Sequence, residues 1–175
     1  DLPQILQDEG GWPARSTADA FVEYAELVSK ALGDRVKNWT TFNEPRVSAW
    51  IGHFEGRHAP GHQDQSEFLK AAHHLLLAHG KAVPVIRENV TNANVGMVLD
   101  FSPQYAASAS DADLDLMRHE DGVFNRWYVE PIAGLGYPKD IVEDFQTSME
   151  FVQENDMEVI SQPIDFLGIN FYSRS

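Results

Sequence analysis

The segment Asn38-Trp39-Thr40-Thr41-Phe42-Asn43-Glu44-Pro45 decides how this chain is built. The short run from Trp39 to Phe42 is typical of a strand, which ends before Pro45 because proline has no backbone N–H to donate to a sheet. An amide and a carboxyl group, Asn43 and Glu44, are therefore left at the carboxyl end of the strand. In barrels and doubly wound folds this edge binds ligands and carries catalytic groups. From these residues alone, a polar strand end without a function is an equally good interpretation.

Helical and strand patterns alternate along the rest of the chain. The predicted helices span 16–32, 66–89, 111–128 and 139–147, with a weaker turn at 156–160, and the predicted strands span 39–42, 94–99 and 164–171. Ser16 is expected to cap the first helix, and Pro84 to kink or divide the second. The loop from 52 to 65 follows the carboxyl end of a strand, where long loops commonly carry function. This alternation implies parallel strands joined by right-handed crossovers.

Three strands are too few to form a closed sheet. Parallel strands are normally buried on both faces, yet two of these three would lie at edges. Either the chain oligomerises or it is part of a larger barrel, and we favour the second interpretation. Residues 1–175 then form a single segment of that barrel, without a domain boundary inside it.

The composition excludes several classes of partner. The 175 residues are 43% hydrophobic and contain no cysteine, so the sequence indicates a globular protein without disulfides or thiolate metal ligands. The net charge of −14 disfavours binding to nucleic acids and to anionic membranes. No apolar run approaches the roughly 20 residues of a membrane span, and no targeting segment is recognisable. We expect a cytoplasmic protein.

Six stretches along the chain form a series of motifs with a characteristic order and spacing. They are Asp-Leu-Pro-Gln at 1–4, Gly-Gly-Trp at 10–12, Trp-Thr-Thr-Phe-Asn-Glu-Pro at 39–45, His-Ala-Pro-Gly at 58–61, Ala-Ala-His-His-Leu-Leu-Leu-Ala-His-Gly at 71–80 and Asp-Phe-Leu-Gly-Ile-Asn-Phe-Tyr at 165–172. In this order and at this spacing they resemble glycoside hydrolase family 1, the β-glucosidase family. The resemblance implies a partial TIM (β/α)8 barrel, in which this chain supplies about strands four to six with their helices.

The resemblance also implies an activity and roles for four residues. Members of the family hydrolyse small β-glucosides and related β-glycosides with retention of configuration, without a metal or an organic cofactor. Glu44 matches the general acid/base, and Asn43 matches the residue that contacts the 2-hydroxyl of the sugar. Tyr172 matches the tyrosine that orients the nucleophilic carboxylate, and Asn170 lines the pocket.

The sequence departs from the family pattern in three respects. The nucleophilic glutamate, which lies in a Thr-Glu-Asn-Gly context on the seventh strand, is not among these residues. Glu88 precedes an asparagine but lies at a helix end, opposite to the catalytic edge. Because retention needs two carboxyl groups about 5 Å apart, we predict that the isolated chain is inactive and needs the rest of the barrel. Arg46 replaces a common tryptophan, and Asp100 stands where asparagine is frequent.

The sequence allows other interpretations, among them a metal site and a non-catalytic half-barrel. The chain has seven histidines, among them His53, His58 and His62 in the predicted loop, but no zinc-protease signature. Surface or buried structural histidines are the better interpretation, so we expect no metal. A half-barrel that binds carbohydrate, or assembles with another chain without catalysis, is one alternative. A different barrel hydrolase with an Asn-Glu-Pro strand end is another.

Overall fold

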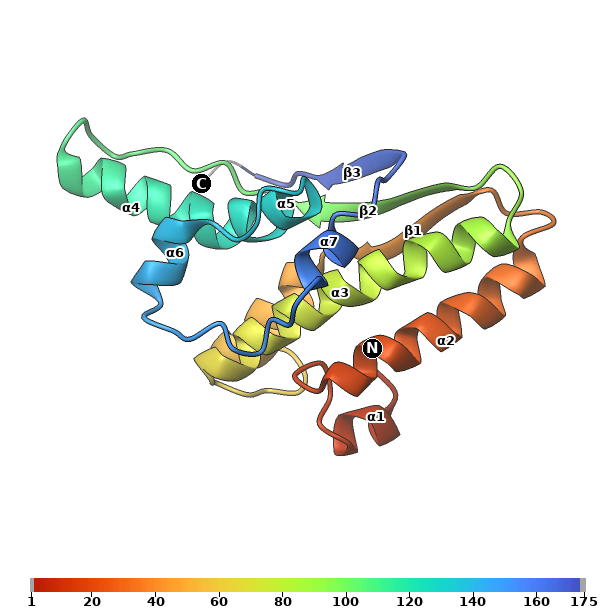
Figure 1. Ribbon diagram of the computed structural model, residues 1–175. Coiled ribbons are helices and arrows are strands. Elements are labelled where there is room, and N and C mark those ends of the chain that lie inside the picture. The colour runs from red at the N-terminus through yellow and green to blue at the C-terminus, as the bar shows by residue number, and fades with distance from the viewer. Residues whose placement is uncertain (1, 174–175) are drawn as a thin grey trace.

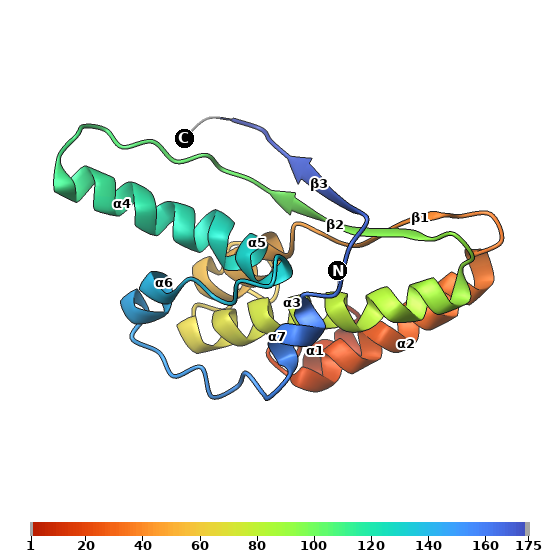
Figure 2. The same ribbon diagram turned by 45° about the horizontal axis from the view of Figure 1, so that its top comes forward.

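The computed structural model describes residues 2–173, in which three strands form one parallel sheet. The strands are β1 (Asn38–Asn43), β2 (Asn94–Asp100) and β3 (Phe166–Asn170), and β2 lies between the other two (Figure 2). Consecutive strands are thus neighbours, as a barrel requires. The predicted strands and their parallel pairing are confirmed.

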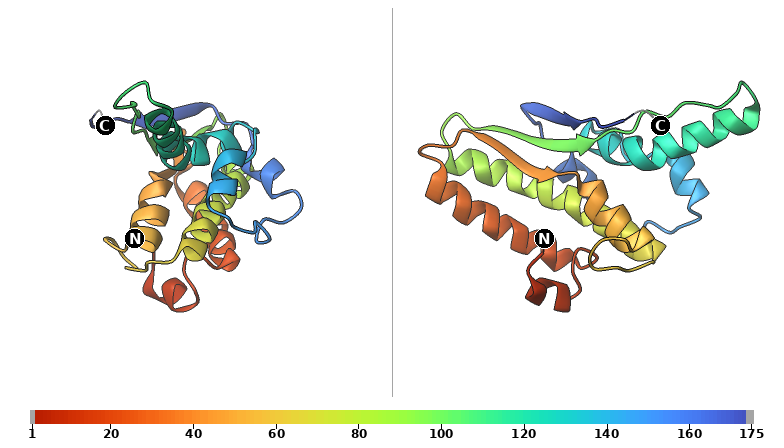
Figure 3. Two further views of the ribbon diagram at one scale, coloured as in Figure 1. Left: turned by 90° about the vertical axis from the view of Figure 1, so that its left-hand side faces the viewer. Right: turned by 180° about the vertical axis from the view of Figure 1, so that it is seen from behind.

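The helices lie on one side of the sheet (Figure 1), and Figure 3 shows the same layering from two further directions. The helical elements are α1 (Gln4–Asp8), α2 (Arg15–Leu32), η1 (Val47–Glu55, π-helical), α3 (Gln65–Asn89), α4 (Asp111–Asp121), η2 (Gly122–Arg126, π-helical), α5 (Trp127–Ile132), α6 (Lys139–Asp144) and α7 (Asp156–Ile160). No helix among the described residues has both the length and the apolarity to cross a membrane. The alternation of strands and helices gives consecutive β/α units.

Two local predictions were wrong, and one of the two alternatives for Pro84 is excluded. The helix α2 begins at Arg15, and no side chain caps it, so Ser16 is not its cap. Pro84 lies inside α3 without dividing it, between the buried Val83 and Ile86. The first part of the predicted 52–65 loop belongs to η1, which shortens the loop to 56–64.

The helix α3 lies at the centre of the core. All residues from 71 to 80 are buried, as expected for a helix surrounded by other elements on every side. A Cβ atom at Gly80 would lie 2.0 Å from the carbonyl oxygen of Val159 in α7. Only glycine therefore lets the backbone of α7 approach α3 this closely.

A buried polar group joins three helices. Asp156 in α7 is 3% exposed and accepts hydrogen bonds from Arg15 Nη1 at 2.8 Å, from His73 at 2.9 Å and from the backbone N–H of Gln153 at 2.8 Å. Burial acts to raise the pKa of Asp156, but these donors outweigh it and lower the pKa well below its ordinary value. His73 is therefore a buried histidine with partners, as the sequence analysis favoured.

Candidate active site

Glu44 follows directly after the last residue of β1. Its backbone N–H donates a hydrogen bond to the carbonyl oxygen of Val98 in β2 at 2.9 Å. Its φ of 53° lies in the left-handed region, which few residues other than glycine adopt. This conformation turns the chain away from the sheet into η1, which starts three residues later. Backbone strain of this kind is concentrated at functional sites.

The four site residues predicted from the sequence lie together at the carboxyl edge of the sheet. Asn170 Nδ2 donates to Oε1 of Glu44 at 2.7 Å, and the hydroxyl of Tyr172 donates to the same oxygen at 2.9 Å. Asn170 also donates to Oδ1 of Asn43 at 3.0 Å. The hydrogen bond to the Glu44 carboxylate raises the pKa of Tyr172. Side chains from β1 and from the end of β3 thus meet across β2.

Arg46 and Asp100, the two residues expected to depart from the family pattern, contact each other. Arg46 Nε donates to Oδ2 of Asp100 at 2.8 Å, and the guanidinium lies 4.9 Å from the ring centroid of Phe124. Burial raises the pKa of Asp100, Arg46 partly offsets the effect, and the negative charge of Glu44 adds to it. Asp100 is therefore a second acid within electrostatic reach of Glu44.

Arg46 and Asp100 stand out in the sequence, but their pairing and the contact with Phe124 were not predicted. The pairing of Arg46 with Asp100 could have been predicted from their opposite charges. Both follow or end a strand of one parallel sheet, and such strand ends meet at one edge. Nothing in the local sequence marks Phe124, which belongs to η2. Among the described residues, the one cluster with metal-ligand spacing is His53, His62 and Glu67, and it does not include Glu44.

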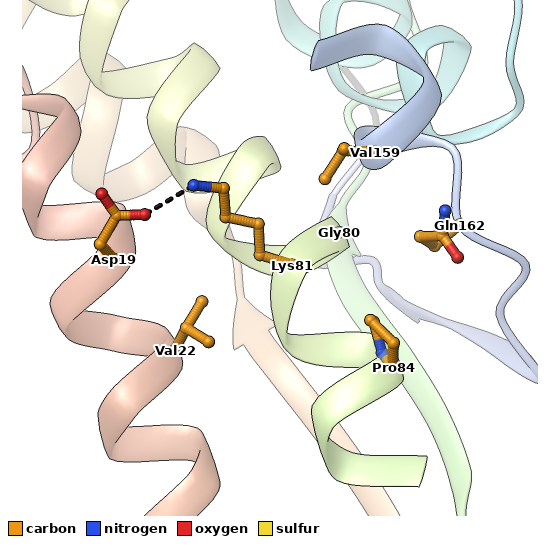
Figure 4. Close-up of a pocket in the computed structure, with 7 residues that line it drawn as sticks. All are labelled: Asp19, Val22, Gly80, Lys81, Pro84, Val159 and Gln162. Carbon is orange, nitrogen blue, oxygen red and sulfur yellow. Dashed lines mark hydrogen bonds and ion pairs between the residues drawn. The ribbon is translucent and has the colours of Figure 1, made fainter. Parts of the chain in front are cut away.

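A groove among the described residues lies away from this site. It has a volume of about 510 Å³ and is lined by residues of α2, α3 and α7 and by Gln162. Figure 4 shows Lys81 reaching from α3 toward Asp19 on α2, and their ion pair measures 2.6 Å. The groove lies in the helical layer and includes no residue of a strand end, so it is not part of the candidate active site.

Consecutive parallel β/α units with a carboxyl group at their carboxyl edge are typical of the class of β/α-barrel enzymes. The model of the family described as Glycosyl hydrolase family 1 matches residues 1–175, and the chain belongs to this family. Its fold is accordingly part of a (β/α)8 barrel.

Individual relatives agree with the family match. Beta-glucosidase A of Acetivibrio thermocellus is 43% identical over 176 residues, which cover 99% of this chain and 39% of the relative. A crystal structure of a beta-glucosidase from Exiguobacterium marinum matches with a TM-score of 0.96 at 42% identity, over 99% of this chain and 41% of that chain. The AHE enzyme from Alicyclobacillus herbarius gives a TM-score of 0.96 at 46% identity, over 99% and 40%. The chain thus spans about 40% of the length of these proteins.

Proposed function

We propose that the complete protein hydrolyses β-glucosides and related β-glycosides with retention of configuration, and that this chain supplies the general acid/base, Glu44. The observation that supports this role most directly is the convergence of Asn170 and Tyr172 on one oxygen of Glu44. Both hydrogen bonds end on Oε1, and none from a described residue reaches Oε2. The second oxygen is therefore available to a glycosidic oxygen and then to water.

Asn43 is the proposed ligand of the sugar 2-hydroxyl. Its Oδ1 accepts the hydrogen bond from Asn170, which directs its amide NH2 group away from that partner. An N–H donor in this position binds a hydroxyl oxygen, and such a bond strengthens in the oxocarbenium-like transition state. Asn170 thus positions both Asn43 and Glu44. The role of Tyr172 toward a nucleophilic carboxylate requires a partner from the rest of the barrel.

The remaining barrel strands are the proposed partner. Leu167 and Ile169 in β3 are 37% and 64% exposed, and they alternate along the strand, so they share one uncovered face. Phe171, directly after β3, is 59% exposed. β1 and β3 each pair on one side only within residues 2–173. We infer that β1, β2 and β3 are the fourth to sixth strands, that residues 1–175 form one continuous barrel segment, and that the nucleophile lies in the remainder.

A chimaera tests this function. The matched segment of beta-glucosidase A from Acetivibrio thermocellus is replaced by this chain, so that the relative supplies the other strands. We expect the chimaera to hydrolyse 4-nitrophenyl β-glucoside and Glu44→Gln to lower kcat/KM by about 10²- to 10⁴-fold. The loss should be smaller for a dinitrophenyl glucoside, whose leaving group needs little protonation. Glu88→Gln, at the exposed end of α3, is the matched control.

Two outcomes would contradict the proposal. Hydrolysis by the isolated 175-residue chain, abolished by Glu44→Gln, would show that the rest of the barrel is not needed. A folded chimaera that binds a glucoside without hydrolysing it would favour the non-catalytic half-barrel instead.

A further inference from the structure

Three potential metal ligands meet at the far end of η1. His53 belongs to η1, His62 to the loop 56–64 and Glu67 to the first turn of α3. One ligand atom from each lies within 4.8 Å of the other two. Two imidazole nitrogens and one carboxylate oxygen form a ligand set that is typical of zinc. The cluster shares no residue with the site around Glu44.

One of the two histidine nitrogens is buried and has no hydrogen-bond partner. His53 is 1% exposed, and its Nδ1 makes no hydrogen bond although it lies 3.5 Å from Oε2 of Glu67. The same oxygen already contacts Nδ1 of His62 at 2.5 Å. The pair of His62 and Glu67 therefore leaves His53 unsatisfied, and a buried polar atom without a partner destabilises the fold. A cation between the three atoms would satisfy all of them.

The backbone brings these residues together without a metal. The N–H of His62 donates to the carbonyl oxygen of Gly52 at 3.0 Å. The N–H of Asp64 donates to the carbonyl oxygen of His53 at 2.8 Å. The side chain of Asp64 in turn caps α3 by accepting from the N–H of Glu67 at 2.8 Å. The backbone segments that carry the three ligands are thus held together by hydrogen bonds, so little backbone ordering is needed on binding.

We propose that His53, His62 and Glu67 bind one Zn²⁺ ion, with water completing the coordination. Tetrahedral bonds of about 2.0–2.1 Å require ligand atoms roughly 3.3 Å apart. The separation between His53 and Glu67 already fits, whereas the pair of His62 and Glu67 must open. Their side chains are 45% and 38% exposed, which leaves them room to rotate around the fixed His53. The ion would anchor the loop 56–64 to both η1 and α3.

Metal titration of the 175-residue chain tests the site. Chelator-treated protein is titrated with Zn²⁺ by calorimetry and with Co²⁺ by visible absorption, and circular dichroism records its folding. We expect one Zn²⁺ per chain and the intense visible bands of four-coordinate Co²⁺. His62→Gln and Glu67→Gln should each weaken binding at least tenfold. His58→Gln, an exposed histidine in the same loop, is the matched control and should bind normally.

The readouts separate this site from nonspecific binding to an acidic protein. Zn²⁺ should raise the melting temperature of the wild type and of His58→Gln but not of His62→Gln, and Mg²⁺ should raise none, because it prefers oxygen ligands. Binding that survives both His62→Gln and Glu67→Gln would overturn the proposal. A Co²⁺ spectrum that remains that of the hydrated ion would also overturn the proposal, whether the chain is folded or unfolded.

Discussion

Arg46 and Asp100 form a buried ion pair that joins the residue after Pro45 to the last residue of β2, with Nε and Oδ2 2.8 Å apart. Their side chains are 18% and 7% exposed. The two positions that the family resemblance marks as departures are therefore paired with each other. A single substitution at either position would leave a charge without its partner next to the candidate active site.

The first prediction concerns this pair. Arg46→Gln should destabilise the chain by about 3–5 kcal/mol, because it leaves the Asp100 carboxylate buried and unpaired. Arg46→Gln combined with Asp100→Asn should recover much of this loss. Urea unfolding of the wild type, both single variants and the double variant gives the coupling free energy. The coupling would be contradicted if the two single variants change the free energy of unfolding by amounts whose sum equals the change in the double variant within about 0.5 kcal/mol.

The second prediction uses the hydroxyl of Tyr172 as a reporter of the site. The hydrogen bond to the Glu44 carboxylate raises the pKa of Tyr172, so Glu44→Gln should lower it toward the ordinary value of about 10. NMR of chains labelled at the tyrosine ring carbon Cζ follows this titration without any need for activity. Glu88→Gln removes a distant carboxylate and should leave Tyr172 unchanged. An unchanged titration in Glu44→Gln would mean that the two side chains do not interact in solution.

The third prediction is a loss of stability in acid. Burial lowers the pKa of His74 and of His79 to about 4 each. Between about pH 6.5 and pH 4 the unfolded chain binds protons that the folded chain does not, so the free energy of unfolding falls as the pH falls. Each group contributes up to about 3 kcal/mol over this window.

Urea unfolding at several pH values across the window measures the slope. His79→Gln removes one of the two groups and should flatten the dependence, whatever its effect at neutral pH. The exposed His58 serves as the control, and His58→Gln should retain the wild-type slope. Equal slopes in all three proteins would contradict the assignment.

The fourth prediction concerns the contact between α3 and α7. Gly80→Ala should destabilise the chain by about 1–3 kcal/mol, because the added Cβ would meet the carbonyl oxygen of Val159 at 2.0 Å. In an exposed helix the same change would stabilise by up to about 1 kcal/mol. The sign of the change in thermal unfolding is therefore the test. Glu88→Ala on the same helix should have little effect.

The strands and the clustering of the candidate site residues could be predicted from the sequence for a physical reason. Pro45 ends β1, and parallel strands bring their carboxyl ends to one edge, so Asn43, Glu44 and Asn170 had to lie near one another. The assignment of roles to these residues remains a prediction that came from the family resemblance. Neither periodicity nor composition could have supplied it.

Features that depend on neighbours distant in the sequence were not predicted. Phe124 contacts Arg46 only because η2 packs beside the end of β2, and no local pattern records that placement. The apolar residues Tyr24 and Leu27 of α2 lie at helical spacing, yet they are 61% and 70% exposed. α2 buries Ala18 and Ala25 instead, since small side chains allow a close approach to α3. The cluster of His53, His62 and Glu67 was likewise not predicted, because Glu67 belongs to α3 and not to the loop with the histidines.

The hydrogen bond from Asn170 to Glu44 has a consequence for how the molecule folds. It joins residues that are 126 positions apart, and both must first dock on opposite sides of β2. Contacts between residues so distant in sequence carry the largest loop-closure entropy and slow folding. A chain emerging from the ribosome would complete β1, η1 and the whole of α3 before Asn170 exists. Glu44 would therefore acquire its hydrogen-bond donors among the last steps of folding, after the core around α3 has formed.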